Sequence, residues 1–185
     1  MKVLIVIAHP DRNSVDHSKL ISTIRFQYKK LGHTVEVLDL YDIGYNPSTF
    51  VGDISHINNN AFAKSFRHSI KTAKHIWIIS PTRWLSLDPL MEGFIDQVFI
   101  KGFAYDDAGV LLGDRKCGVI VTSTQHKSLN WKTLGILWIR LRLIVFPTMF
   151  KFKNIKVLQI WNIKKLNNLE LNKYLFRIKN TVNNF

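Results

Sequence analysis

Residues 2–16 have the sequence KVLIVIAHPDRNSVD, an apolar run followed by a polar loop. Residues 2–8 are rich in Val and Ile and lack polar alternation, which is typical of a strand buried on both faces of a parallel sheet. The residues that follow predict a helix from Asp16 to Leu31, closed by Gly32. The apolar positions that recur at helical spacing within it are Leu20, Ile24, Tyr28 and Leu31.

The same alternation of strand and helix continues to the end of the chain. Helices are predicted around Ala61–Ala73 and after Asp88, an N-cap residue followed by Pro89 at the first helical position. A C-terminal helix is indicated by the spacing of Leu171, Leu175, Ile178 and Val182. Further strands are predicted at Thr34–Leu38, His75–Ser80, Lys116–Thr122 and Ile155–Ile160, with Pro81 ending the second of these. This pattern predicts one doubly wound α/β domain over residues 1–185.

Composition excludes several classes of protein. The one cysteine, Cys117, rules out a disulfide framework and is expected to be a buried strand residue. No Cys/His cluster has zinc-ligand spacing, so no metal is expected. The formal charge of +13 is scattered along the chain, and we therefore expect no nucleic-acid partner. Such a charge also favours phosphate-bearing cofactors.

Two apolar segments bear on membranes and location. The first, residues 2–8, precedes His9-Pro10-Asp11-Arg12 and not a small-residue cleavage site, so a cytoplasmic protein is expected. The second, Leu134–Phe150, is interrupted by two arginines and is short for a membrane-spanning helix. It is expected to pack in the core or against a second subunit. The alternative is a peripheral contact with a membrane or a membrane protein.

Ligands of open parallel sheets bind beyond the carboxyl ends of the strands, which nominates the loops 9–16, 81–87 and 122–128. The first loop enters a helix N-terminus, where backbone N–H groups and the helix dipole attract anions. Its His9 and Ser14 add donors for a phosphate, although Ser14 or Asp16 can equally serve as a helix cap. The loop is neither a GxGxxG fingerprint nor a P-loop.

The other two loops suit a flat heterocycle. Trp84 offers an apolar surface to a flavin ring, and Arg83 adds positive charge beside it, although a Trp packed under the loop is an equal alternative. Thr122–Gln125 supplies hydroxyls and an amide, and a solvated polar loop is the competing interpretation.

Three stretches together resemble the flavodoxin-like NAD(P)H:quinone oxidoreductases, including small bacterial members that are ancillary subunits of potassium efflux systems. They are Ala8-His9-Pro10 with Ser14; the run of Pro81, Trp84, Pro89, Gly93, Asp96 and Val98; and Gly102-Phe103-Ala104-Tyr105. The resemblance covers about residues 1–122. It implies a flavodoxin-like three-layer sandwich with a five-stranded parallel sheet of order 2-1-3-4-5. It also implies a homodimer with each active site at the subunit boundary.

The resemblance also implies the cofactor, the substrates and the site residues. The cofactor is FMN, with FAD as the alternative; NAD(P)H is the co-substrate and a quinone-like molecule the acceptor. Tyr105 would line the substrate pocket, from either subunit, as the candidate catalytic residue. The implied flavin contacts are His9, Ser14, Val15 and Asp16 for the phosphate and ribityl chain, Thr82, Arg83, Trp84 and Leu85 for the ring, and Thr122, Ser123, Thr124 and Gln125 on its other edge.

One departure from the family keeps an alternative open. The fourth-strand loop of the family normally has the sequence Thr-Thr-Gly-Gly, whereas this chain has Thr122-Ser123-Thr124-Gln125. The expected reaction is two-electron, ping-pong hydride transfer from NAD(P)H through flavin to the acceptor. The larger side chains at 124 and 125 favour a second hypothesis, a regulatory or binding subunit with little turnover. A one-electron flavodoxin-type carrier is a third, although such carriers are commonly acidic.

Overall fold

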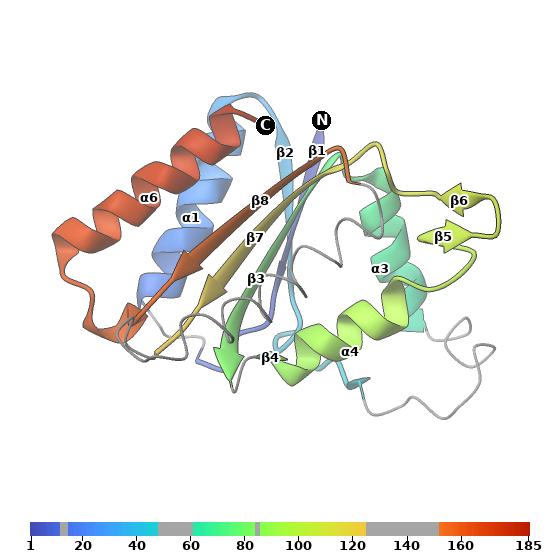
Figure 1. The fold of residues 1–185 in the computed structure, drawn as a ribbon, viewed down its shortest axis with the longest axis horizontal. Coiled ribbons are helices and arrows are strands. Elements are labelled where there is room, and N and C mark those ends of the chain that lie inside the picture. The colour runs from blue at the N-terminus through green and yellow to red at the C-terminus, as the bar shows by residue number, and fades with distance from the viewer. Residues whose placement is uncertain (12–14, 48–60, 84–85, 125–151) are drawn as a thin grey trace.

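A twisted parallel sheet forms the middle of the molecule (Figure 1). The computed structural model describes residues 1–11, 15–47, 61–83, 86–124 and 152–185. The parallel strands are β1 (Lys2–Ile7), β2 (Thr34–Asp39), β3 (His75–Arg83), β7 (Lys116–Thr122) and β8 (Asn154–Ile160). Their order is β2-β1-β3-β7-β8, which confirms the predicted order 2-1-3-4-5.

Helices cover both faces of this sheet, giving three layers (Figure 1). On one face lie α1 (Val15–Lys30) and α6 (Asn168–Asn183), which follow the β1 and β8 segments. On the other face lie α3 (Ala61–Thr72) and α4 (Pro89–Val98). The small elements are β4 (Ser86–Leu87), paired with β3, the β5–β6 hairpin (Tyr105–Asp106 and Gly109–Val110) and the 3₁₀ turn η3 (Ile163–Lys165).

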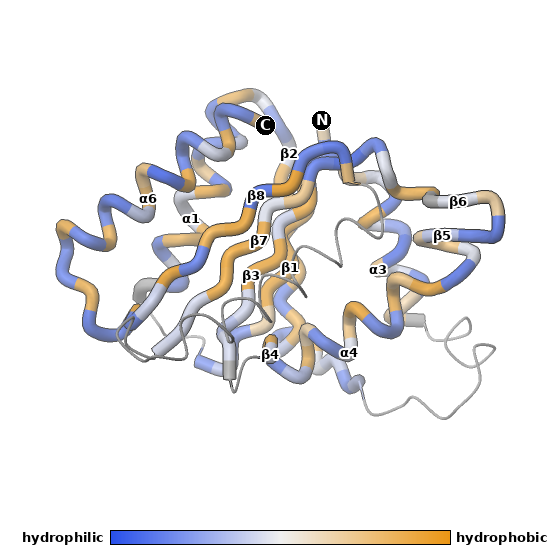
Figure 2. The backbone as a smooth tube through the Cα atoms, in the orientation of Figure 1, coloured by the Kyte–Doolittle hydropathy of each residue, from blue (hydrophilic) through white to orange (hydrophobic). Residues whose placement is uncertain are grey.

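The central strands β1, β3 and β7 are mostly apolar, and the sheet separates two hydrophobic cores (Figure 2). The α1/α6 core contains Leu20, Ile24 and Tyr28 of α1, as the helical spacing predicted. Leu31 was wrongly placed on that buried face, since its side chain is 45% exposed. The reason is that α1 ends at Lys30 and Gly32 adopts φ +75°, which turns the chain away from the helix.

The amino-terminal end of the sheet contains a closed hydrogen-bond chain. Trp77 Nε1 donates to Tyr28 Oη at 3.0 Å, and that hydroxyl lies 2.9 Å from His75 Nδ1. All three side chains are buried, and the indole N–H, the phenol hydroxyl and the Nδ1 atom of His75 each have a partner, as burial requires. Gly118 on β7 makes room for the indole, because a Cβ at this position would lie 2.5 Å from Trp77 Cε3.

Arg115 closes the same end of the sheet on its α3/α4 side. Its side chain is buried, and its Nε and Nη2 donate to the carbonyls of Ile70 and Lys71 at 3.2 and 2.9 Å. Nη1 donates to Asp114 at 2.6 Å. The guanidinium therefore donates to two carbonyl groups in the last turn of α3, of which that of Ile70 also accepts from Ala73 N at 3.3 Å.

Pro81 does not end its strand, contrary to the prediction from sequence. β3 continues to Arg83, and Thr82 and Arg83 pair with the antiparallel β4. Backbone groups of residues 79 and 81 point to the same side, toward β1, because alternate residues of a strand share that direction. β1 pairs with β3 only as far as Ile79, so the missing N–H of Pro81 removes no ladder hydrogen bond.

Candidate functional site

The described parts of the three nominated loops start at one edge of the sheet. Ile7 pairs with Ile79, Pro81 pairs with Thr122, and Thr122 pairs with Ile160. The carboxyl ends of β1, β3, β7 and β8 are therefore neighbours, as the switch-point rule requires. The backbone N–H of Ala8 donates to Ile79 O at 3.0 Å, which fixes where the first loop leaves the sheet.

Thr122 is the point at which side chains from all three segments meet. His17 Nε2, one turn into α1, lies 3.1 Å from Thr122 Oγ1. Thr82 Oγ1, on β3, donates to the Thr122 carbonyl at 3.3 Å. The helix that follows β1 and the ends of β3 and β7 are thus connected by hydrogen bonds through one residue.

His17 is a functional candidate that the sequence analysis missed. Its side chain is buried, and its ring centroid lies 3.5 Å from that of His9. Burial, reinforced by the nearby His9 and opposed by Asp11, lowers the pKa of His17 to about 3. The neutral ring therefore serves as a fixed hydrogen-bonding partner for Thr122 near neutral pH. The missed signal was its position on the apolar stripe of α1, three residues before Leu20.

His9 lies at the first turn of the polar loop. The backbone N–H of Asp11 donates to His9 Nδ1 at 3.1 Å, which closes a short turn directly after β1. Stacked on His17, the imidazole is held at the carboxyl end of the sheet beside the start of α1. This is the end of a helix at which a bound anion is favoured.

Two acidic side chains, the buried Asp88 and the half-buried Glu92, hold the chain between β3 and α4. Asp88 caps α4 by accepting from Leu90 N, which confirms the predicted N-cap, and it also accepts from Tyr41 Oη at 3.0 and 3.1 Å. Glu92 Oε1 accepts from Leu87 N at 3.0 Å. β4 pairs with Thr82 and Arg83 at the end of β3. The bonds of Asp88 and Glu92 hold β4 and the start of α4, so the described residues on both sides of the segment predicted to contact a ring are held in place.

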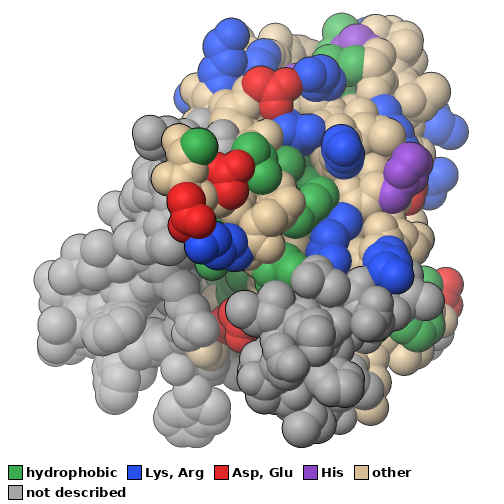
Figure 3. Space-filling view, turned by 90° about the vertical axis from the view of Figure 1, so that its right-hand side faces the viewer, with side chains coloured by type: hydrophobic (Ala, Val, Ile, Leu, Met, Phe, Trp, Pro, Cys, Tyr) green, Lys and Arg blue, Asp and Glu red, His purple; other side chains and the backbone are tan. Residues whose placement is uncertain are grey.

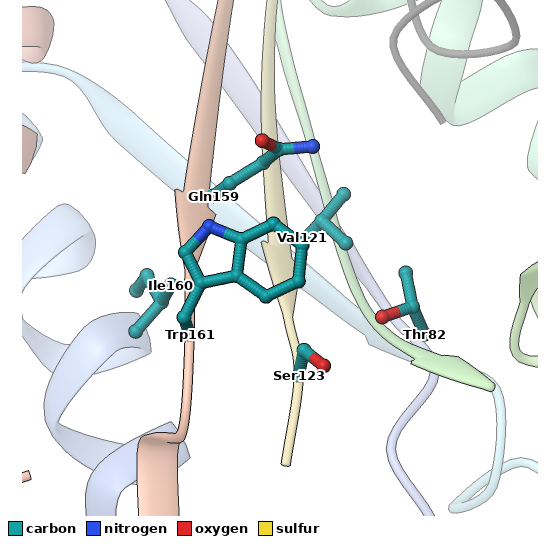
Figure 4. Close-up of a pocket in the computed structure, with 6 residues that line it drawn as sticks. All are labelled: Thr82, Val121, Ser123, Gln159, Ile160 and Trp161. Carbon is teal, nitrogen blue, oxygen red and sulfur yellow. The ribbon is translucent and has the colours of Figure 1, made fainter. Parts of the chain in front are cut away.

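A small recess opens at the carboxyl ends of β3, β7 and β8 (Figure 4). Its volume is about 10 Å³, and its lining is Thr82, Val121, Ser123, Gln159, Ile160 and Trp161. Gln159 Nε2 is buried and has no hydrogen-bond partner in the part of the chain that the structure describes. Gln159 and Trp161 were also missed, because one amide near the end of an apolar strand does not indicate a site by itself.

The structure brings together some of the predicted residues and does not describe others. His9, Thr82, Thr122, Ser123 and Thr124 lie at or next to the carboxyl ends of neighbouring strands. The predicted contacts outside the described residues are Ser14, Trp84, Leu85 and Gln125, together with the side chains of Val15, Asp16 and Arg83.

Tyr105 lies apart from the other candidates within the single chain. It belongs to β5, which Figure 1 shows on the α3 side of the molecule, away from the carboxyl ends of the parallel strands. Its side chain is 40% exposed. Its assignment to a substrate pocket, completed by a second subunit, stays a prediction.

The polar groups at the strand ends are of the chemical types that a flavin can bind. The ring of a flavin presents carbonyl oxygens and ring nitrogens along one edge, and its side chain ends in a phosphate. The described residues offer the hydroxyl of Ser123, an unpartnered amide N–H₂ from Gln159, and a helix N-terminus beside His9. No group of three or more metal-ligating side chains occurs within the described ranges.

Comparison with known families agrees with this architecture. A family model described as "Flavodoxin-like fold" matches residues 1–175. The chain belongs to that family. Within this flavodoxin-like family, ribosyldihydronicotinamide dehydrogenase [quinone] of Mus musculus is 27% identical over 137 residues, covering 60% of this chain and 59% of that protein. The chain spans a little more than half the length of the curated relatives it matches.

Solved structures share the fold along the whole chain. The NAD(P)H:quinone oxidoreductase from Methanothermobacter marburgensis has a TM-score of 0.82 at 20% identity, covering 100% of this chain and 96% of that one. An FMN-dependent NADH-azoreductase from Bacillus anthracis, solved in complex with FMN, has a TM-score of 0.78 at 17% identity, covering 100% and 99%. At these identities the likeness establishes the fold.

Proposed function

We propose that this flavodoxin-like protein is a flavin-dependent NAD(P)H oxidoreductase that reduces a quinone-like acceptor by two electrons. The proposal depends most on one observation: Thr122 connects α1, β3 and β7 at the end of the sheet where this fold binds ligands. The printed names of its relatives, which include quinone and azo reductases, support the same general kind of reaction. FMN is the proposed cofactor, with FAD as the alternative.

Different residues of the chain would bind different parts of the cofactor. His9 and the start of α1, with Ser14, Val15 and Asp16, would hold the phosphate and ribityl chain. Residues 82–85 and 122–125 would hold the ring between the ends of β3 and β7. When bound, the flavin supplies the hydride chemistry, and the protein supplies position, hydrogen-bond donors and exclusion of water.

His17 would act as a positioning residue in this arrangement. Because its ring is neutral and buried, it holds the Thr122 hydroxyl without adding a charge next to the ring site. It also stacks on His9, so a change at position 17 affects both the phosphate end and the ring end of the proposed site. Reduction of a quinone to a hydroquinone would take up one hydride, supplied through the flavin, and one proton, supplied by solvent.

The assembly is proposed to be a homodimer in which Tyr105 of one subunit completes the acceptor pocket of the other. Its side chain is exposed on β5, remote from the strand ends of its own chain, which is compatible with that role. Light scattering after size exclusion measures the assembly state. A dimer in which Tyr105→Phe raises the KM for the quinone would support the arrangement, and a monomer with full activity would refute it.

The test of the proposed function begins with the purified full chain. Incubation with FMN or FAD, removal of free flavin and an absorbance spectrum show whether a flavin is retained. Steady-state oxidation of NADH or NADPH with a quinone then measures turnover. A chain that stays colourless with both flavins contradicts the proposal.

Substitution of His17 connects that test to the geometry. His17→Gln keeps a polar side chain but loses the stacked imidazole, and we expect a loss of flavin affinity on the order of tenfold, from one hydrogen bond of about 1 kcal/mol plus the lost stacking. The matched control is His68→Gln on α3, an exposed side chain on the other side of the sheet, which should leave flavin affinity unchanged. Equal losses in both variants would contradict the role given to His17.

A second candidate function is favoured by the fourth-strand loop. Thr124 is exposed directly after β7, at a position where the resemblance expects glycine. A protein that keeps bound flavin but oxidises NAD(P)H no faster than free flavin would be the regulatory or binding subunit. The variant Thr124→Gly separates the two functions, because a gain of turnover would show that this side chain limits an existing enzyme.

A further inference from the structure

The outer surfaces of α1 and α6 form a face with an unusual combination of side chains. Phe26 and Phe176 are 66% and 62% exposed, and Leu169 is 67% exposed. Each phenylalanine lies two residues from a buried side chain of its helix, Ile24 or Ile178, which is about 200° around the helix. Both rings therefore point away from the sheet into solvent.

These apolar side chains lie on two neighbouring helices. α1 and α6 lie side by side on the same face of the sheet (Figure 1), and Gln27 Nε2 donates to Asn183 Oδ1 across them at 2.6 Å. A shallow depression of about 480 Å³ lies over α6, and Leu169, Lys173, Phe176 and Arg177 are part of its lining. The apolar groups are thus spread over two packed helices.

The charges on this face have almost one sign. Among the exposed side chains that the structure describes on α1 and α6, only Glu170 is acidic, and its carboxylate accepts from Asn167 N in the capping box of α6. The exposed cations of the two helices are Arg25, Lys29, Lys30, Lys173, Arg177 and Lys179.

The opposite side of the molecule also exposes apolar side chains, among them Phe62 and Leu111, but its charges are of both signs. Basic and acidic groups are interspersed on the face that carries α3 and the β5–β6 hairpin (Figure 3), and ion pairs such as Lys74–Asp114 and Lys101–Asp107 occur in this part of the chain. The acidic groups among these cations reduce the net attraction of this face for a polyanion. The α1/α6 face is therefore distinguished by more than the basic composition of the whole protein.

We propose that the α1/α6 face binds the surface of an anionic phospholipid bilayer. Cations attract the acidic headgroups, while exposed phenylalanine and leucine side chains enter the boundary between headgroups and acyl chains. A nucleic-acid duplex would use the cations but would leave Phe26, Leu169 and Phe176 in water. No helix among the described residues is long and apolar enough to cross a membrane.

The test is co-sedimentation of the full chain with vesicles of phosphatidylcholine, with or without phosphatidylserine. The wild-type chain should bind the mixed vesicles and not the neutral ones. Lys173→Glu/Arg177→Glu should lower the partition coefficient by on the order of a hundredfold, because each reversed cation removes attraction and adds repulsion. Phe26→Ser/Phe176→Ser, which keeps the charge, should lower it by roughly tenfold.

Matched controls separate this face from net charge. Lys64→Glu/Lys71→Glu on α3 makes the same change in charge on the other side of the sheet, and Phe62→Ser removes an exposed phenylalanine there. Both should leave binding within about twofold of the wild-type level. Equal losses in the α3 and α6 variants, no binding by the wild-type chain, or binding to duplex DNA that depends on Lys173 and Arg177 without vesicle binding would each overturn the proposal. Circular dichroism confirms that each variant is folded.

Discussion

The two ends of the parallel sheet are built differently. At the amino-terminal end, buried polar groups are paired: Tyr28, His75 and Trp77 form a closed chain, and Arg115 satisfies carbonyls at the end of α3. At the carboxyl end, hydroxyls cluster around Thr122, and the buried Gln159 Nε2 lacks a partner within the described ranges. The comparison teaches that one end satisfies its buried polar groups within the chain, while the other leaves a buried amide donor without a partner among the described residues.

The largest effect is expected from Gly118→Ala at the amino-terminal end. The new Cβ would lie 2.5 Å from the buried Trp77 ring, and overpacking of this kind costs about 3 kcal/mol of unfolding free energy. Urea denaturation measures the loss, and flavin affinity should stay unchanged. Trp77→Ala removes the ring atoms that clash, so the double variant should be less destabilised than the sum of the two single variants. Additive effects would exclude the clash as the cause.

Arg115→Met is expected to cost about 2 kcal/mol, because two carbonyls near the end of α3 lose a buried guanidinium donor. The stability measurement is again urea denaturation. Arg25→Met on the exposed side of α1 is the matched control and should change stability by less than about 0.5 kcal/mol. If Arg115→Met lowered flavin affinity as well as the free energy of unfolding, the amino-terminal end of the sheet would not be independent of the proposed flavin site.

Acid should destabilise both ends through one histidine each. Burial lowers the pKa of His75 to about 4 and that of His17 to about 3, from an ordinary value of 6.5. Between pH 6.5 and 4.5 the unfolded chain therefore binds protons that the folded chain does not. The free energy of unfolding should fall with falling pH, by up to about 1.4 kcal/mol per pH unit for each histidine.

Substituting each histidine shows which end of the sheet contributes to the dependence of the unfolding free energy on pH. His75→Gln should remove the contribution of the amino-terminal end, and His17→Gln that of the carboxyl end, when denaturation is followed across this pH range without flavin. Lowered carboxyl pKa values, as at Glu36, affect stability only below this window. A slope that survives both substitutions would place its origin elsewhere.

The smallest effect, and the only gain, is expected from Gln159→Leu. The change removes a buried amide whose Nε2 has no partner among the described residues, so stability should rise by about 1 kcal/mol. Flavin binding should weaken if the recess beside Thr82 and Ser123 serves the cofactor. A loss of stability would show that the amide is satisfied in the folded protein, for example by water.

Much of the fold was predictable because it depends on local patterns. The apolar runs at residues 2–8 and 116–122 were recognisable as strands β1 and β7, because a strand that is buried on both faces lacks polar alternation. The start of α4 at Asp88-Pro89 was predictable because helix capping is a local interaction. The continuation of β3 past Pro81 was not predictable. It depends on where the neighbouring strand β1 ends, which is a tertiary fact.

The candidate site was predictable in location and incomplete in detail. The switch-point rule identified the strand ends that meet at Thr122, because the topology of the sheet places them together. His17 and Gln159 were missed because a polar residue on an apolar stripe gives no sign of whether it is buried. Their roles depend on Thr122 and on the recess, which only the folded chain brings into contact with them.

The buried thiol of Cys117 has a practical consequence. Its side chain is fully buried on β7, and burial raises the pKa of the thiol to about 12, so it has neither the access nor the thiolate that alkylating reagents need. Alkylation of Cys117 in the native chain therefore requires the central sheet to open, and the rate of alkylation measures how often it opens. Cysteines introduced elsewhere can carry spectroscopic labels without first removing the natural one.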